Sequence, residues 1–228
     1  MILQYLSEFQ QDPIATTLFI GIIIIAIVVA VTIHEFSHAI VADQLGDFTA
    51  RKLGRLTLKP SAHLDPMGSI IFLVAGFGWG KPVPVVQNNI KKLNPQIGLA
   101  LISLVGPGSN FIFSLLLAIL IRFELIPNSV LNIDLVASFI FILINVNILL
   151  CVFNLLPLPP LDGFKVILGI LPSRFSNSLS QMERYGAIPL FGMLILDMTF
   201  NSINIFGTLI GTPVGFTLEL MLDITGRV

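Results

Sequence analysis

The sequence predicts an all-α polytopic membrane protein with about five to six transmembrane or re-entrant helices and a short membrane-associated β segment. Of its 228 residues, 55% are hydrophobic and only 11% are charged. The mean hydropathy is +0.94, and apolar runs of roughly 20 residues recur towards the C-terminus. We therefore expect one integral-membrane domain over residues 1–228, with a core at about 14–171 and C-terminal helices at about 186–222.

This composition also limits the classes of partner and domain. Apolar blocks of this length leave no room for a sizeable soluble module such as a PDZ, nucleotide-binding or DNA-binding domain. The formal net charge is −1, with basic residues scattered through the connections, so no nucleic acid partner is expected. The expected surroundings are the lipid bilayer. The single cysteine, Cys151, lies in an apolar run and cannot form an intramolecular disulfide.

The first predicted helix begins at Asp12-Pro13, a favourable start, and ends at Gly46, a natural stop. Its length of about 48 Å exceeds a hydrocarbon core of about 30 Å, so the helix must tilt or emerge into the headgroups. We expect it to remain as an anchor, because no basic residue precedes Arg51. The connection that follows is rich in basic residues, and the positive-inside rule makes this side cytoplasmic.

The next two segments do not fit a regular crossing. Residues 66–80 are apolar but short and rich in glycine, which is typical of a re-entrant or broken segment. In the segment after it, prolines at alternate positions forbid a helix and allow an extended edge strand. Such an edge could pair with a peptide. The candidate strand residues are Lys81, Pro82, Val83, Pro84 and Val85.

Two further full spans are expected at 97–121 and 135–156. The first is interrupted near its start by Gly106-Pro107-Gly108, and the second ends in a proline-rich break before Asp162. The charges of the connecting loops place Asp162 on the cytoplasmic side, at a depth similar to that of the end of the first helix. Two less regular apolar stretches, 188–200 and 203–222, form a hairpin or a kinked pair.

The first helix carries a pattern typical of metal sites. His34 and His38 are four residues apart, on one helical face, where two imidazoles can share one Zn²⁺. Glu35 is offset from that face and suits a general base. Catalytic zinc takes a third protein ligand, and Asp162 is the carboxylate at matching depth. Ionisable groups inside a membrane are costly and usually functional, so the pattern predicts a membrane-embedded metal site.

Each of these residues also has a structural interpretation. The HExxH spacing occurs by chance in unrelated chains, and Leu-Asp-Gly is common in turns. Asn110 and Asn154 could bond to backbone groups of neighbouring helices, as polar residues do in membrane bundles. His63 fits a loop or interfacial position better than a ligand position. Gly106 and its neighbours could serve close packing or a kink.

Taken in order, the motifs resemble those of the site-2 protease family, the intramembrane zinc metalloproteases of peptidase family M50. The resemblance is to the short bacterial and archaeal members, without PDZ or CBS domains, and it extends over about residues 14–171. The matching motifs are His34 to His38, His63 to Gly68, Gly78 to Pro84, Gly106 to Asn110, and Asn154 to Gly163.

The resemblance implies that one Zn²⁺ per chain is held by His34, His38 and Asp162, with Glu35 as the catalytic base. Asn154 and Asn110 match asparagines near the family's active site and become candidates for oxyanion or substrate contacts. The implied activity is regulated intramembrane proteolysis: hydrolysis of peptide bonds in or near transmembrane helices of a membrane-protein substrate. The implied location is a prokaryotic cell membrane, with the site towards the cytoplasm.

Other functional classes remain open. A catalytically silent metal-binding scaffold would show the same ligands. A metal transporter would need a path across the bilayer, whereas all the candidate ligands lie towards one side. Membrane peptidases of the CAAX-processing kind use a glutamate as third ligand, but Glu124 falls in the predicted external loop, and Glu183 and Glu219 lack a matching motif.

Overall fold

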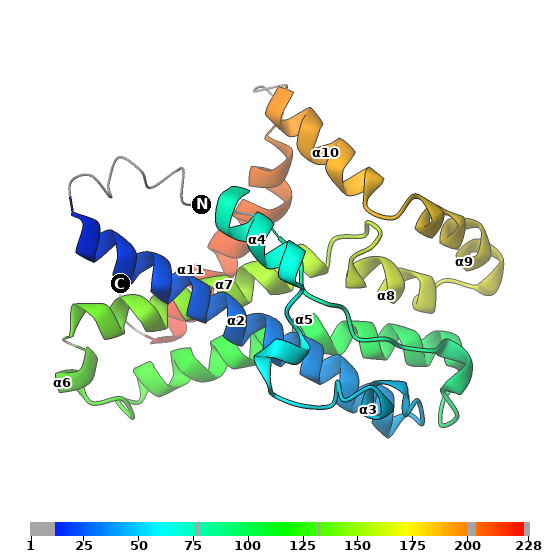
Figure 1. Ribbon diagram of the computed structural model, residues 1–228, viewed down its shortest axis with the longest axis horizontal. Coiled ribbons are helices and arrows are strands. Elements are labelled where there is room, and N and C mark those ends of the chain that lie inside the picture. The colour runs from blue at the N-terminus through cyan, green and yellow to red at the C-terminus, as the bar shows by residue number, and fades with distance from the viewer. Residues whose placement is uncertain (1–11, 76–77, 132, 200–203, 226–228) are drawn as a thin grey trace.

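The computed structural model describes residues 12–75, 78–131, 133–199 and 204–225 (Figure 1). Within these ranges the chain is helical and forms no sheet, which confirms the predicted all-α class. Gly76 of the glycine-rich segment, and Phe200 and Ile203 at the inner ends of the two C-terminal stretches, lie outside the described residues.

Three of the described helices are long and apolar enough to cross a membrane, as expected of an integral membrane protein. They are α2 (Pro13–Gln44), α5 (Pro95–Arg122) and α7 (Asp134–Asn154). The first two begin at side-chain caps, because the carboxylate of Asp12 and the amide oxygen of Asn94 each accept backbone N–H groups of the first turn. The predicted spans are thus confirmed to within a few residues.

Helix α5 lies against both α2 and α7 and runs antiparallel to each (Figure 1). The antiparallel direction follows from the contacts with α2: His34 contacts Asn110, whereas the later His38 contacts the earlier Ile102. The C-terminal end of α2, the N-terminal end of α5 and the C-terminal end of α7 therefore lie at one end of the bundle.

The face of α2 that meets α5 is a stripe of small residues and histidines. Residues at intervals of four along this face are all buried: Ala26, Ala30, His34, His38 and Ala42. Small side chains let transmembrane helices approach closely, and polar side chains between them find partners on the neighbouring helix. The stripe therefore carries the two imidazoles into the interior of the bundle rather than towards lipid.

The predicted interruption at Gly106-Pro107-Gly108 is wrong, because α5 continues through it as one helix. Pro107 has no N–H to donate to the carbonyl of Ser103, four residues earlier, which costs one helical hydrogen bond. The neighbouring α2 packs along α5 on both sides of this position, at Ile102 and at Asn110, and these contacts favour the helical form.

The remaining described elements are short. Helix α4 (Pro66–Ala75) spans ten residues, about 15 Å, and is too short to cross a bilayer, as predicted. Helix α8 (Asp162–Ile170), which the sequence did not predict, packs against α5. The others are α3 (Thr49–Lys52), η2 (Pro60–Ala62), η3 (Gln87–Asn89), α6 (Asn128–Leu131), α9 (Ser173–Ser180), η4 (Gln181–Tyr185), α10 (Ile188–Thr199), the π-helical η5 (Gly207–Gly211) and α11 (Thr212–Thr225).

The segment 81–86 is not helical, as predicted, but it belongs to no strand. The β interaction found among the described residues is an isolated antiparallel bridge between Leu64 and Gly80. Pro82 and Pro84 carry no N–H, so only the alternate residues of this segment can donate a hydrogen bond to a neighbouring strand. The predicted edge strand is thus an unpaired segment in this structure.

Candidate metal centre

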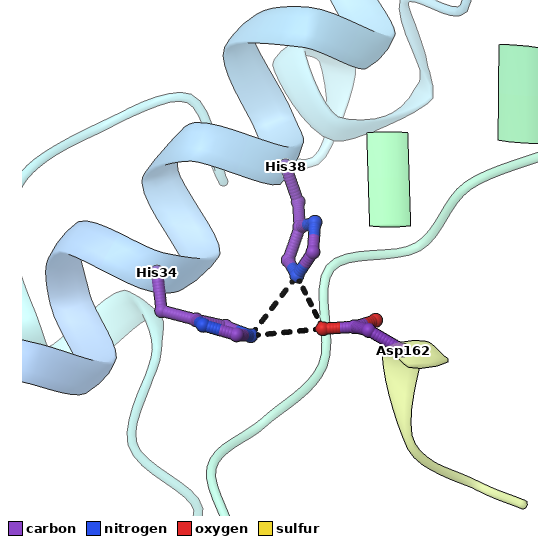
Figure 2. Close-up of side chains that lie close together, drawn as sticks. All are labelled: His34, His38 and Asp162. Carbon is purple, nitrogen blue, oxygen red and sulfur yellow. Dashed lines mark hydrogen bonds and ion pairs between the residues drawn. The ribbon is translucent and has the colours of Figure 1, made fainter. Parts of the chain in front are cut away.

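Three side chains converge inside the bundle, two from the C-terminal half of α2 and one from the start of α8 (Figure 2). The Nε2 atoms of His34 and His38 lie 3.1 Å apart, and each lies 3.1 Å from Oδ2 of Asp162. All three residues are buried. The structure therefore brings together the three side chains that the sequence predicted as ligands, with Asp162 lying 124 and 128 residues from the two histidines.

The far nitrogen of each ring determines which tautomer is present. Nδ1 of His38 lies 2.6 Å from the carbonyl oxygen of Ile102, and a carbonyl can only accept, so this nitrogen carries the hydrogen. Nδ1 of His34 lies 2.8 Å from Oδ1 of Asn110, which is also an acceptor. In its neutral form, each imidazole therefore presents the lone pair of Nε2 to the common point.

These tautomers leave three acceptor atoms facing one another in a buried position. Two imidazole lone pairs and the Asp162 carboxylate would repel unless a cation lies between them. Tetrahedral zinc, with ligands at about 2.0–2.1 Å, separates its ligand atoms by about 3.3 Å, close to the observed 3.1 Å. The nitrogen and oxygen donors and their spacing fit Zn²⁺ with one position left open.

Asp162 is held in place by the chain around it. It is the first residue of α8, directly after the proline-rich break. A Cβ on Gly163 would lie 2.2 Å from the carbonyl oxygen of Leu155, so only glycine lets this loop fold back so closely. Lys165 places Nζ 3.9 Å from Oδ1 of Asp162. The carboxylate therefore turns one oxygen to Lys165 and the other to the histidines.

Helix α8 is in turn docked on α5. Nε2 of Gln96 donates to the carbonyl oxygens of Leu168 and Leu171, at 2.6 and 2.9 Å. A Cβ on Gly169 would lie only 2.2 Å from Cβ of Ala100, so the two helices are in close contact there. These contacts place the start of α8 opposite the histidines.

Gly106 leaves the space that the imidazoles occupy. A Cβ at this position would lie 2.3 Å from Nε2 of His38 and 2.8 Å from Cε1 of His34. The equivalent atom on Gly108, in the same helix, would have no neighbour within 4 Å. The sequence indicated packing or a kink here, but the requirement for glycine comes from the site.

Glu35 lies beside the cluster but supplies none of its three ligand atoms. Its carboxylate is half-buried, and Oε2 accepts a hydrogen bond of 2.8 Å from the backbone N–H of Val83. The candidate base and the candidate substrate-binding segment are therefore in direct contact.

The segment 81–86 is tied to the body of the protein at three points besides Glu35. The N–H of Lys81 donates to the carbonyl oxygen of His63 at 2.8 Å, and Arg55 donates to the carbonyl oxygen of Lys81. The N–H of Val86 donates to Oδ2 of Asp47 at 2.7 Å. Among the described residues, no partner is found for the N–H of Val85.

Asp47 anchors the far end of this segment. Besides Val86, its fully buried carboxylate accepts from the backbone and hydroxyl of Thr49 and from the amide of Asn89. Burial alone would raise the pKa of Asp47, but these hydrogen bonds to the charged form outweigh burial and lower the pKa below its usual value.

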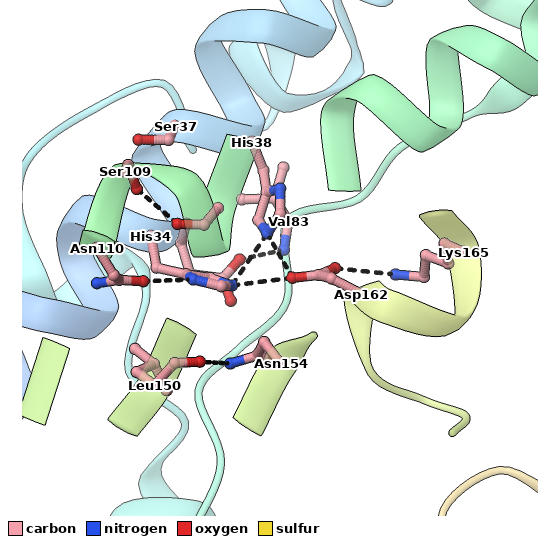
Figure 3. A network of polar contacts seen from close by, with 12 residues as sticks. His34, Ser37, His38, Val83, Ser109, Asn110, Leu150, Asn154, Asp162 and Lys165 are labelled. Carbon is pink, nitrogen blue, oxygen red and sulfur yellow. Dashed lines mark hydrogen bonds and ion pairs between the residues drawn. The ribbon is translucent and has the colours of Figure 1, made fainter. Parts of the chain in front are cut away.

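The two predicted asparagines have different surroundings (Figure 3). Asn110 is fully buried and uses all its polar atoms, because Oδ1 faces His34 while Nδ2 donates to Ala30 and to Asn147. Asn154 is half-buried and donates to the carbonyl oxygen of Leu150 in its own helix. Asn147 was not predicted as part of the site: its place in an apolar helix marks it as unusual, but Asn145 and Asn154 share that feature.

The alternative ligands do not reach the site. His63 is buried, and its Nε2 lies 2.7 Å from the carbonyl oxygen of Thr57. Among the described residues, no other histidine, cysteine or carboxylate joins the group of His34, His38 and Asp162.

Comparison with known proteins points to one family. The model described as "Peptidase family M50" matches residues 123–196, which include Asp162 but not the two histidines. Relatives of the chain carry the name "Putative zinc metalloprotease". YwhC of Bacillus subtilis (strain 168) is 43% identical over 173 residues, covering 73% of this chain and 76% of that protein.

Rip2 of Mycolicibacterium smegmatis is 27% identical over 196 residues, covering 83% of this chain and 74% of its own. Rip2 of Mycobacterium tuberculosis (strain H37Rv) is 28% identical over 203 residues, covering 87% and 76%. No solved structure matches the chain.

Proposed function

Since this chain belongs to peptidase family M50, we propose that it is a zinc metalloprotease that hydrolyses peptide bonds in or near the transmembrane helices of membrane proteins. The observation that carries the proposal is the buried triangle of two Nε2 atoms and one carboxylate oxygen, 3.1 Å on each side. Its three residues are those expected to hold one Zn²⁺ per chain.

Each of the four residues at the site would have its own role in this reaction. When bound, zinc would supply a Lewis acid that lowers the pKa of a water molecule and polarises a carbonyl group. His34, His38 and Asp162 would hold the ion. Glu35 follows His34 directly in the helix, and its Oε1 has acceptor capacity left, so it would take a proton from the attacking water and pass it to the leaving amine.

The expected substrate is a transmembrane protein or peptide. Carbonyl groups in a helix are already hydrogen-bonded, so the substrate must unwind before it can be attacked. We infer that Lys81 to Val85 binds the unwound stretch by strand addition. The free N–H of Val85 supports this role, since it would give a substrate carbonyl a donor while Val83 remains bound to Glu35.

We propose a prokaryotic cell membrane as the location, with the site towards the cytoplasm. The support is the positive-inside rule applied to the connection after α2, whose basic residues outnumber its single aspartate. They are Arg51, Lys52, Arg55 and Lys59. Protease protection of a tag inserted after Gly54, in inverted membrane vesicles, tests this orientation, and a tag shielded in those vesicles would refute it.

The test of function is cleavage of a panel of tagged single-span substrates by the purified protein in detergent. Glu35→Gln should retain zinc and lose cleavage by about 10²- to 10⁴-fold, because a general base of this kind contributes that much. Glu124→Gln, at an exposed position, is the matched control and should cleave like the wild type. Zinc without cleavage in the wild type would favour the catalytically silent scaffold, and a protein that binds no zinc would overturn the metal site.

A further inference from the structure

A chain of hydrogen bonds connects α7 to one of the metal ligands. Nδ2 of Asn147 donates to the carbonyl oxygen of Leu143 at 2.8 Å, and Oδ1 of Asn147 accepts from Nδ2 of Asn110 at 2.7 Å. Oδ1 of Asn110 then accepts from Nδ1 of His34 at 2.8 Å. Both asparagines are fully buried, so water does not compete for these bonds.

We propose that Asn147 is a positioning residue that fixes the tautomer of His34 through Asn110, and so sets the affinity of the site for its metal ion. The inference deepens the proposed function: the part that concerns zinc affinity rests on that function, and the part that concerns the tautomer of His34 does not. Asn147 itself touches neither the ligand triangle nor the space beside it.

The direction of the chain follows from which atoms can donate. The carbonyl oxygen of Leu143 only accepts, so Asn147 must turn its NH₂ group there and its oxygen to Asn110. The two hydrogens of Asn110 are then used by Asn147 and by the carbonyl oxygen of Ala30. The oxygen of Asn110 is left for His34, whose Nδ1 must donate, and the lone pair of Nε2 then faces the metal position.

The contact across helices distinguishes Asn147 from the other asparagines of α7. Asn145 is half-buried and donates to the carbonyl oxygen of Phe141, and Asn154 donates to that of Leu150. Both bonds stay within the helix. Asn147 makes the same type of bond and in addition receives one from α5. Without it, one hydrogen of Asn110 is buried unpaired, and the orientation of its amide rests on Ala30 alone.

The experiment compares two buried links between α5 and α7. Asn147→Leu keeps the volume and removes the link to Asn110. Ser114→Ala is the matched control, since Oγ of Ser114 is fully buried and donates to the carbonyl oxygen of Ile144 at 3.1 Å without reaching His34. Asn147→Ser, which is too short to reach Asn110, repeats the test if Asn147→Leu does not fold.

Two readouts are taken. The ¹⁵N shifts of the imidazoles in metal-free protein report which ring nitrogen carries the hydrogen, with the His34 signals identified by their loss in His34→Gln. Zinc affinity is measured by competition with a chelator. We expect Asn147→Leu to populate both tautomers of His34 and to bind zinc about tenfold more weakly, at the lower end of outer-shell effects. Ser114→Ala should leave the tautomer unchanged and the affinity within about twofold.

Two outcomes would overturn the inference. One is a wild-type tautomer and affinity in the Asn147 variant. The other is an equal loss in Ser114→Ala, which would indicate general loosening of the helix pair. Neither readout involves peptide cleavage, so a chain that fails to cleave any substrate contradicts the proposed function and leaves the tautomer result to stand by itself.

Discussion

Gly106→Ala is expected to weaken zinc binding strongly while the protein still folds. The added methyl group would lie 2.3 Å from Nε2 of His38. The imidazole must retreat by about 0.7 Å to reach even 3.0 Å, whereas metal sites tolerate deviations of about 0.2 Å in ligand distances. His38 cannot shift freely, because its other nitrogen is bound to the carbonyl oxygen of Ile102.

The steric clash disturbs the metal site rather than the fold, because the atoms that must move belong to the imidazole rings of His34 and His38. Replacing glycine by alanine in a helix interior is itself favourable by about 0.8–1.0 kcal/mol. We therefore expect wild-type helicity, a thermal midpoint that is unchanged or slightly higher in metal-free protein, and zinc affinity weaker by about 100-fold, the upper end of what disturbed metal surroundings cost.

The assay is chelator competition together with circular dichroism, and Gly108→Ala is the control. Gly108 lies in the same helix, and an added Cβ there has no neighbour within 4 Å, so this variant should bind zinc like the wild type. Wild-type affinity in Gly106→Ala would refute the steric argument. So would equal losses in both variants, because these would point to the backbone of α5 instead.

Two further predictions concern the segment 81–86. The pKa of Asp47 is lowered in the folded protein, so its stabilising contribution is complete above the unfolded pKa of about 3.9 and is lost as the pH falls through the folded value. The difference in thermal midpoint between wild type and Asp47→Asn should therefore shrink below about pH 4, and a difference that stays constant with pH would contradict this. Val85→Pro should slow cleavage by about two- to tenfold, the effect of one hydrogen bond, and leave the zinc content unchanged. Val85→Ala retains the N–H and should cleave like the wild type. Equal cleavage rates in the two variants would count against strand addition.

The long helices could be predicted from sequence because their signals are local, and the grouping of His34, His38 and Asp162 could be predicted from spacing, charges and lengths. Asp12 and Asn94 cap the first turns of α2 and α5, and both bonds span two or three residues. The i, i+4 spacing of His34 and His38 places both on one face of any helix. Asp162 was predicted from charges and lengths, which need no knowledge of packing.

The remaining features depend on packing between helices. The bond from Asn110 to Asn147 requires the register between α5 and α7, and nothing in the chain distinguishes Asn147 from Asn145 or Asn154 before that register is known. The role of Gly106 likewise appears only when α2 is placed against α5. Pro107 was expected to break its helix, but local propensity is outweighed here by contacts on both sides.

The separation of the ligands along the chain has a consequence for biosynthesis. His34 precedes Asp162 by 128 residues, which at about 5–20 residues per second corresponds to roughly 6–25 s of translation. During that interval the nascent chain holds both imidazoles in its first membrane helix without the carboxylate that completes the triangle. A ribosome that stalls before α8 therefore leaves a two-ligand intermediate, and the centre closes only once the first turn of α8 has left the exit tunnel and reached α5.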